Sequence, residues 1–483
     1  MDAETLNQLA WRYLQAGETQ LALEHALRAH ELKKNDLAYL NTLGVAYGEA
    51  GQLDLAEATF RKLLKRKPGF VAALVNLAKS LEKQERLEEA APLFERALAI
   101  EPAFPKLAVN LARVYAQRGD VARRRSLLER HVRQIDPQDF AMAMAQCELD
   151  SGETGQALQR LREAVAAHED WKLARSALAH LQLSIGDWRE GWPEYVRRRN
   201  LLDPRPNALP PPLAARLDGK TLLLRGEQGI GDVLFFLRFA PMLRERGARL
   251  VLACERKLHS VVRANEVLAE VRAEEGAGFD RAIWTADLPA VLGTEETPPA
   301  WRLEVDAAAR RDAETKLAAL GPAPYLAVTW RAGTDTAQGR EFGAERAFLT
   351  KSVPTKALGE ALRGWRGTTL LLQRGARADD AAQFAAGFAA PFHDLSALGE
   401  DLSAMLAALS LVDEYVGVSN TNMHLLAGIG RSARVIVPYP PEWRWLRREG
   451  RSPWFPDFPV YRQPASRDWS APLAALRKDL GLG

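Results

Sequence analysis

The chain has 483 residues, more than one ordinary domain contains, so we expect two or three folding units. Hydrophobic residues make up 47% and charged residues 26% of the composition, which are ordinary values for a folded protein and exclude a disordered or collagen-like chain. With 65 Lys and Arg against 62 Asp and Glu, the formal charge is only +3. Nothing global therefore indicates a nucleic-acid partner or a membrane-surface protein.

Cysteine content and the N-terminus bear on where the protein works. Cys147 and Cys254 are the two cysteines, too few and too far apart for a disulfide framework or a thiolate metal cluster. The first residues are acidic and lead into an amphipathic helix rather than a signal peptide. No apolar run approaches the roughly eighteen residues of a membrane span. We expect a cytoplasmic protein without a membrane span.

The N-terminal part repeats about every 34 residues. Leucine, a small residue and tyrosine recur in register, followed by alanine and phenylalanine, and a proline closes the unit. This pattern predicts pairs of helices with a small residue where two helices touch. The matching columns are Leu9, Leu43, Leu77 and Leu111; Ala10, Gly44, Ala78 and Ala112; Tyr13, Tyr47 and Tyr115; Ala22, Ala56 and Ala90; Phe60 and Phe94; and Pro68 and Pro102.

This unit resembles the tetratricopeptide repeat, and the resemblance implies an α-solenoid of about six helix pairs over residues 1–200. Such an array presents a concave surface to a protein or peptide. Asn76 and Asn110, one repeat apart, are expected on that surface, where an asparagine ladder grips the substrate of O-GlcNAc-transferase-like proteins. The plain alternative is that asparagine is simply common at this helix position, because the third rung is Thr42.

A proline-rich linker is expected over residues 201–217, after an aromatic segment with Trp188 and Trp192 that would seal the solenoid. Beyond the linker, short apolar strands alternate with helical stretches, which predicts two Rossmann-like α/β blocks, 218–308 and 309–483, with a ligand cleft between them. The expected strands are Thr221 to Arg225, Arg249 to Ala253, Leu326 to Trp330, Thr368 to Leu372, Glu414 to Val418 and Ala433 to Val437.

A glycine-rich turn, Gly226 to Asp232, joins the first of these strands to a helix expected to end near Arg246. Its spacing matches neither the dinucleotide fingerprint nor a Walker A loop. Asp232 then has two interpretations. It is a helix N-cap, stabilising by about 0.5–2 kcal/mol, or it is a carboxylate at the edge of a parallel sheet that takes a proton from an attacking hydroxyl, a role that contributes about 10² to 10⁴ in rate.

Three motifs, at residues 229–234, 328–334 and 418–428, resemble the ordered motifs of heptosyltransferase-like GT-B glycosyltransferases. With the N-terminal repeats and a tryptophan-rich tail, almost the whole chain is similar to bacterial TPR-containing glycosyltransferases. The resemblance implies a GT-B pair, with 218–308 on the acceptor side and 309–483, ending in a helix, on the nucleotide-sugar side. It also implies inverting transfer of a sugar from a nucleotide-sugar donor to a protein or peptide held by the solenoid.

The resemblance places the catalytic base on Asp232 and implies a donor site around the second and third motifs. At the third motif the family usually has Asp-Thr-Gly or Asp-Thr-Ala where this chain has Asn420-Thr421-Asn422, so the donor's identity does not carry over. Two candidates have plain alternatives: His424 as a packed helix-face residue and Lys351 as an exposed loop residue. The full set of donor-site candidates is Gly229, Gly231, Arg331, Thr334, Lys351, Ser352, Asn420, Thr421, Asn422 and His424.

The sequence holds no Asp-x-Asp pair and no zinc motif, so we expect no metal and no cofactor besides the nucleotide-sugar co-substrate. Charge on the leaving diphosphate would be met by a helix N-terminus and arginines. The rival hypothesis is a catalytically inactive scaffold with a degenerate transferase-like half, which Asn420 and Asn422 favour. The joint presence of Gly229, Asp232 and Arg331 argues against it.

Overall fold

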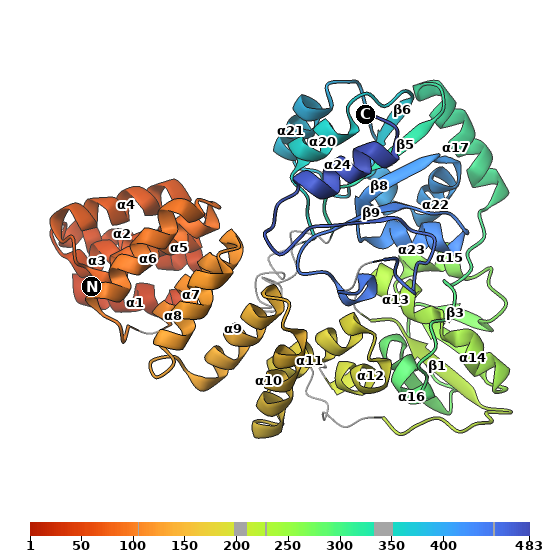
Figure 1. Cartoon of the computed structure of the whole chain (residues 1–483), viewed down its shortest axis with the longest axis horizontal. Helices are drawn as coiled ribbons and strands as arrows, with labels where there is room; N and C mark the ends of the chain where they lie inside the picture. Colours follow the sequence, from red (N-terminus) through yellow and green to blue (C-terminus); the bar gives the residue numbers. More distant parts are fainter. Residues whose placement is uncertain (105, 198–209, 228, 333–350, 448–449) are drawn as a thin grey trace. The chain divides into compact units, whose positions relative to one another are not determined.

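The structure is a computed structural model that describes residues 1–104, 106–197, 210–227, 229–332, 351–447 and 450–483 (Figure 1). Contacts divide the chain into two compact units, Met1–Ala164 and Val165–Gly483. The second unit contains every strand and also α11 (Lys172–Ile185) and α12 (Trp188–Arg197). The contacts therefore group these two helices with the α/β part, although the repeat pattern had placed them in the solenoid.

The repeat region consists of helices joined by short turns, and from α1 to α9 each helix packs against the next along the chain. With α11 and α12 they make the six predicted pairs. Gly44 shows why a small residue is needed within a pair, because a Cβ there would lie 2.5 Å from the ring of Phe60. The first ten helices are α1 (Ala3–Gln15), α2 (Thr19–Leu32), α3 (Leu37–Glu49), α4 (Leu53–Arg66), α5 (Val71–Lys83), α6 (Leu87–Ile100), α7 (Leu107–Arg118), α8 (Val121–Arg130), α9 (Pro137–Asp150) and α10 (Thr154–Ala167).

The α/β part contains a four-stranded sheet in the order β3-β2-β1-β4 and a six-stranded sheet in the order β10-β9-β8-β5-β6-β7. All neighbouring strands are parallel. The four-stranded sheet has the doubly wound order 3-2-1-4, and the six-stranded sheet has the order 3-2-1-4-5-6 when it is read from β7 and β5 is counted as its first strand. The strands are β1 (Thr221–Arg225), β2 (Arg249–Ala253), β3 (Glu270–Arg272), β4 (Arg281–Trp284), β5 (Tyr325–Val328), β6 (Thr368–Leu371), β7 (His393–Asp394), β8 (Glu414–Val418), β9 (Arg434–Val437) and β10 (Val460–Arg462).

Helices cover both faces of the six-stranded sheet, as Figure 1 shows. Along β5, Leu326 and Val328 face one hydrophobic cluster and Ala327 faces another, because successive strand residues point to opposite faces. The first cluster receives α20 (Thr355–Leu362), α21 (Ala378–Phe388) and α24 (Ser470–Asp479), and the second receives α17 (Ala307–Leu320) and α22 (Leu402–Leu411). Burial on both faces explains the continuous apolar runs of these strands.

An aromatic cluster joins α12 to the α/β core. Trp192, only 2% exposed, packs edge-on against Phe236 and Phe239, which flank the end of α13 (Ile230–Leu237). It also meets Trp443 and Trp454 of the C-terminal tail, with ring centroids 5.4 and 6.0 Å away. Trp192, expected to seal the solenoid, is therefore also a member of the second unit's hydrophobic core.

Sequence reasoning missed four strands and one helix break. The strands β3, β4, β7 and β10 have two to four residues with few buried side chains, so they lack the apolar run used to find the others. The helix expected to run to Arg246 is divided at Arg238 and Phe239 into α13 and α14 (Ala240–Glu245). Pro241 occupies the first turn of α14, where its missing N–H costs nothing.

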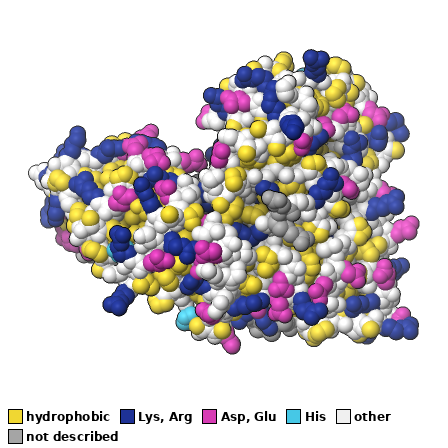
Figure 2. Space-filling view, in the orientation of Figure 1, with side chains coloured by type: hydrophobic (Ala, Val, Ile, Leu, Met, Phe, Trp, Pro, Cys, Tyr) yellow, Lys and Arg dark blue, Asp and Glu magenta, His cyan; other side chains and the backbone are white. Residues whose placement is uncertain are grey.

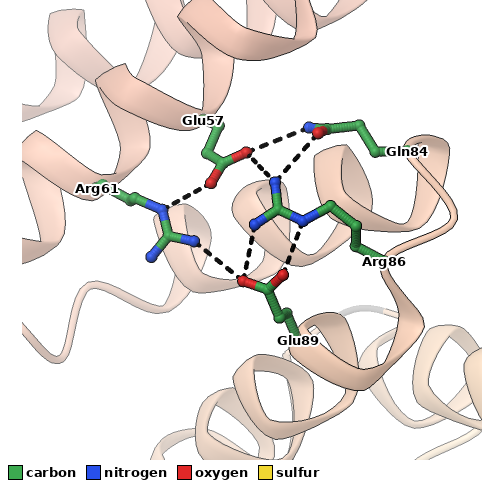
Figure 3. A network of polar contacts seen from close by, with 5 residues as sticks. All are labelled: Glu57, Arg61, Gln84, Arg86 and Glu89. Atoms are coloured by element: carbon green, nitrogen blue, oxygen red, sulfur yellow. Dashed lines mark hydrogen bonds and ion pairs between the residues drawn. The ribbon is translucent and has the colours of Figure 1, made fainter.

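Charged side chains of both signs are interspersed on the face of the molecule in Figure 2, in keeping with the formal charge of +3. One network links neighbouring repeats (Figure 3). Glu57 of α4 accepts hydrogen bonds from Arg61 and from Arg86, at 2.8 and 2.7 Å, and Arg86 also donates to Glu89 of α6. Burial alone would raise the pKa of Glu57, but hydrogen bonds from Arg61, Arg86 and Gln84 lower it below its ordinary value.

We expect the replacement Glu57→Gln to lower the free energy of unfolding by about 0.5–1 kcal/mol at neutral pH, because it removes the carboxylate shared by two arginines. A carboxyl group with a lowered pKa in the folded state contributes stability above its unfolded pKa and loses it as pH falls. The difference between wild type and variant should therefore be smaller at about pH 3 than at neutral pH.

Urea unfolding at both pH values measures this difference. Glu31→Gln on α2 is the control, since the described residues give Glu31 no ion pair. A difference that persists at the acidic pH would contradict the ionic explanation.

Candidate functional site

Two helix N-termini meet beside the carboxyl ends of β1 and β8. Helix α13 follows the glycine turn after β1, and α23 (Thr421–Gly428) follows β8. A Cβ on Gly231 would lie 3.0 Å from Cδ2 of His424 and 3.4 Å from Cα of Thr421, so glycine permits this close approach. The strands β1 and β8 are next to the points where strand order reverses in their sheets, the usual place for ligands in such folds.

Asp232 lies at this junction. It is not the N-cap of α13, which is Gly229, but the third helical residue, and its carboxylate accepts the N–H of Gly229 at 3.3 Å. Its other oxygen, Oδ1, accepts a hydrogen bond from Nη2 of Arg444 at 2.5 Å. The side chain is 30% exposed, so both contacts orient a carboxylate that solvent can still reach.

Arg444 continues an ion chain away from Asp232. Its other Nη group donates to Glu442, whose Oε2 lies 2.9 Å from Nζ of Lys351 and accepts the hydroxyl of Ser419 at 3.0 Å. Glu442 is 7% exposed. Burial would raise its pKa, but the charges of Lys351 and Arg444 lower it well below its ordinary value.

Aromatic rings surround the Arg444 guanidinium. Its Cζ atom lies 4.5 Å from the ring centroid of Phe235 and 4.4 Å from that of Trp443. These ring faces attract the cation and exclude water from it. The guanidinium therefore joins a carboxylate on α13 to one in the C-terminal tail inside an apolar wall.

A second group of candidates lies at the end of β5. The backbone of Arg331 forms an antiparallel bridge with Ser352, and Nη2 of Arg331 donates to the carbonyl of Gly375 at 2.8 Å. Gln373 fixes this turn, because its Oε1 accepts the N–H groups of Trp330 and Arg331, each at 2.9 Å. The structure thus brings Arg331, Ser352 and Lys351 to one sheet edge, and Thr334 lies outside the described residues.

The two asparagines of the third motif have structural partners. Asn420 caps α23 by accepting the N–H of Asn422 at 3.0 Å, and its Nδ2 donates to the hydroxyl of Thr329 at 2.9 Å. The Nδ2 groups of both asparagines also donate to the buried hydroxyl of Tyr415, at 3.2 and 3.1 Å. Both asparagine side chains are thus tied into a polar network around the Tyr415 hydroxyl.

His424 is packed rather than presented to solvent. Its ring meets those of Phe235 and Phe455 edge-on, with centroids 6.0 and 5.5 Å away. Burial, followed by the charges of Arg444 and Arg238, lowers the pKa of His424 well below its ordinary value. The neutral imidazole therefore spaces α23 from α13, and this geometry agrees with the packed-residue interpretation.

A small pocket opens where Lys351 and Glu442 meet the ends of β8 and β9. Its apolar walls come from prolines, a valine and a tryptophan, and its polar groups from the ion chain. The lining residues are Lys351, Ser419, Val437, Pro438, Pro440, Glu442 and Trp445. Among the described residues, no cluster of three or more His, Cys, Asp or Glu side chains is placed to hold a metal ion.

The two asparagines of the repeat region, Asn76 and Asn110, belong to the first unit. Nδ2 of Asn76 donates to Oδ1 of Asn41 at 3.2 Å and so joins α5 to α3. Asn110 accepts a hydrogen bond from Arg113 at 3.4 Å. Both asparagines remain partly exposed.

Sequence reasoning missed Glu442 and Arg444, although both stand in the tryptophan-rich tail that carries the resemblance. The available signal was two opposite charges inside an aromatic run, a composition that demands buried partners. Tyr415 and Gln373 were also missed, because each resembles an ordinary strand residue.

Comparisons with known proteins agree with the fold of the first unit. Two family descriptions of the tetratricopeptide repeat match residues 41–108 and 81–147. The N-terminal region of this chain therefore contains tetratricopeptide repeats, as predicted. In the part of the chain that the structure describes, no helix is both long and apolar enough to cross a membrane.

Protein FlbA of Caulobacter vibrioides is 27% identical over 357 residues, which cover 66% of this chain and 57% of FlbA. The chain thus matches little more than half the length of that relative. A TPR protein of Thermus thermophilus is 21% identical with a TM-score of 0.32, covering 37% of this chain and 97% of that structure. MamA of Desulfovibrio magneticus is 20% identical with the same TM-score, covering 35% and 96%.

The polar network around Tyr415 gives a stability prediction. Tyr415→Phe should lower the free energy of unfolding by about 1–3 kcal/mol, because the buried groups of Thr329, Asn420 and Asn422 lose a partner. Tyr325→Phe is the matched control, since the Tyr325 hydroxyl makes a single 3.2 Å bond to the carbonyl of Gly321. Chemical denaturation followed by circular dichroism measures the free energy of unfolding of both variants. Equal losses would show that the network around Tyr415 stabilises the fold no more than the single hydrogen bond of Tyr325 does.

Proposed function

We propose that the second unit is a GT-B glycosyltransferase that needs no metal and transfers a sugar, with inversion, from a nucleotide-sugar to a protein or peptide held by the repeats. The observation that carries this proposal is the junction of α13 and α23. It sets Asp232 beside two helix N-termini at the ligand-binding edges of two parallel sheets. The resemblance of three ordered motifs to heptosyltransferase-like enzymes supports the same assignment.

The junction suits a diphosphate leaving group. Helix N-termini carry unpaired N–H groups and partial positive charge, so they attract phosphate oxygens. Lys351 lies at the edge of the same sheet, with its side chain 33% exposed, and Arg331 follows β5. These groups would stabilise the negative charge that develops on the nucleoside diphosphate.

Asp232 would act as the general base. Its carboxylate takes the proton of an acceptor hydroxyl while the hydroxyl oxygen bonds to the anomeric carbon. The bond from that carbon to the diphosphate oxygen breaks on the opposite face, and its electron pair leaves with the diphosphate, so the configuration inverts. Arg444 and the N–H of Gly229 hold the carboxylate in place for this step.

The repeats support a protein or peptide acceptor. Stacked tetratricopeptide repeats form extended concave surfaces that bind other chains. The family matches over residues 41–147 support such a surface on the same chain as the junction.

A second candidate function is a binding scaffold without chemistry. It is favoured by the 2.5 Å contact of Arg444 with Asp232, which occupies one oxygen of the proposed base. The inward bonds of the Asn420 and Asn422 amides favour it also.

Nucleotide binding separates the two functions. Melting of the full chain would be followed with UDP, GDP, ADP, TDP and CMP, each with and without magnesium. The full chain is needed because Trp192 belongs to the core of the second unit. A nucleotide at a hundred times its Kd adds about 2.7 kcal/mol, or on the order of 5–10 °C. We expect one nucleotide to raise the Tm independently of magnesium, and no shift with any nucleotide would favour the scaffold.

The variant Asp232→Asn tests the base. An amide oxygen can still accept the N–H of Gly229, so α13 should keep its start, while proton abstraction is lost. We expect sugar release from the donor to fall by about 10² to 10⁴ with nucleotide affinity unchanged.

Asp218→Asn, which breaks only the exposed pair with Arg216, is the control and should keep full activity. Thermal melting of both variants checks that the loss of charge beside Arg444 has not unfolded the unit. Undiminished turnover in Asp232→Asn would show that the base lies elsewhere.

A further inference from the structure

The first helices of successive repeats line one surface of the N-terminal unit. Helices α1, α3 and α5 contact one another in series more extensively than α2, α4 and α6 do. Side chains bridge the same helices: Asn76 donates to Asn41, and Nζ of Lys83 lies 3.0 Å from Glu49. Closer packing of the first helices makes their shared surface the inner, concave side of the array.

At one repeat position of that surface, the side chain changes from apolar to basic along the array. At the spacing of the repeat, the equivalent residues of α1, α3, α5 and α7 are Trp11, Val45, Lys79 and Arg113. Trp11 is 39% exposed, an unusual state for so large an apolar side chain. Val45 and Arg113 are partly exposed and Lys79 is exposed. The row is therefore apolar at the N-terminal repeats and basic two repeats later.

Lys79 is the unmatched charge of this row. Arg113 pairs with Glu82, which also accepts from Gln117 at 3.0 Å. Within the described ranges, Lys79 forms no ion pair with a carboxylate. Burial, followed by the charge of Arg113, lowers the pKa of Lys79 although its side chain is exposed. The ammonium group of Lys79 is thus exposed on this surface, near Arg113 and without an ion pair of its own among the described residues.

The spacing of the row sets the register of a bound chain. Packed helices are about 8–10 Å apart and an extended chain advances about 3.3 Å per residue, so one repeat spans about three residues. Trp11 and Lys79 are two repeats apart. A ligand that touches both must therefore carry its two anchors about six residues apart.

We propose that this row binds an extended peptide segment with a carboxylate side chain on Lys79 and an apolar side chain on Trp11, separated by that spacing. The inference rests on the proposed acceptor-binding role of the repeats and specifies which side chains the acceptor carries. Glu49 and Glu82 border the same row but pair with Lys83 and Arg113, which leaves the single charge of Lys79 to match one carboxylate rather than a polyanion.

Fluorescence anisotropy on the full chain tests the proposal. The probe is a fluorescein-labelled peptide of serine, glycine and proline that carries one phenylalanine and one glutamate at the stated spacing. Matched peptides replace glutamate with glutamine, move it by three positions, or replace phenylalanine with serine. We expect each change to weaken binding roughly tenfold, the value of one lost charge-assisted or apolar contact.

Charge reversal keeps the test independent of folding. Lys79→Glu should lose the glutamate peptide and gain a peptide with lysine at that position, whereas Lys65→Glu, on the outer helix α4, should bind like wild type. Trp11→Ala should weaken the wild-type peptide and leave the serine-substituted peptide unaffected. Equal affinity of Lys79→Glu for both peptides would overturn the proposal.

Nucleotide melting shifts separate this inference from the proposed transferase. If no peptide binds while a nucleotide still raises the Tm, the peptide chemistry is wrong and the donor site stands. If the glutamate peptide binds with the expected register while no nucleotide does, the row is confirmed and the transferase is not.

Discussion

The second unit depends on a buried ion chain, Asp232 to Arg444 to Glu442, that ties its two sheets together. Asp232 lies in the first turn of α13, which follows β1 of the first sheet, whereas Arg444 and Glu442 follow β9, the last inner strand of the second. A guanidinium between aromatic rings has lost most of its water, so it is tolerated only because a carboxylate lies on each side. Removing one partner of such a pair costs about 3–5 kcal/mol, because the remaining charge stays buried. Position and orientation of the proposed base thus follow from a requirement of folding.

The aromatic cluster around Trp192 explains how the ion chain from Asp232 to Glu442 can both stabilise the fold and position the proposed base. Phe235 lies under the Arg444 guanidinium and belongs to the same core as Trp192 and Trp443. Helix α13 therefore presents Asp232 at its start and anchors its remaining turns in hydrocarbon. The hydrophobic packing of α13 fixes the direction in which the Asp232 carboxylate points. Gly231 lets α23 approach so closely that the N-terminus of α23 lies beside that of α13.

Local patterns made most of the fold predictable, and long-range pairing made the site hard to predict. The repeat period revealed the helices, since each pair packs against its sequence neighbours. Buried strands such as β1 and β8 were predicted to the residue because they are continuous apolar runs. Short edge strands such as β3 carry no such run. Arg444 pairs with Asp232 across 212 positions of sequence, and no spacing rule connects residues so far apart. The contacts of Asn420 and Asn422 with the Tyr415 hydroxyl could not be predicted either, because no sequence pattern marks Tyr415 as their partner.

Because α12 packs into the α/β core, the last helix pair differs from the earlier repeats. Helices up to Ala164 form a compact unit of their own, whereas α11 and α12 share a hydrophobic core with the strands. Duplication or deletion of an early repeat would change the length of the array and leave that core untouched. Loss of the last helix pair would expose that core to solvent. The number of early repeats can therefore change without disturbing that core, but the last helix pair must be inherited together with the α/β part.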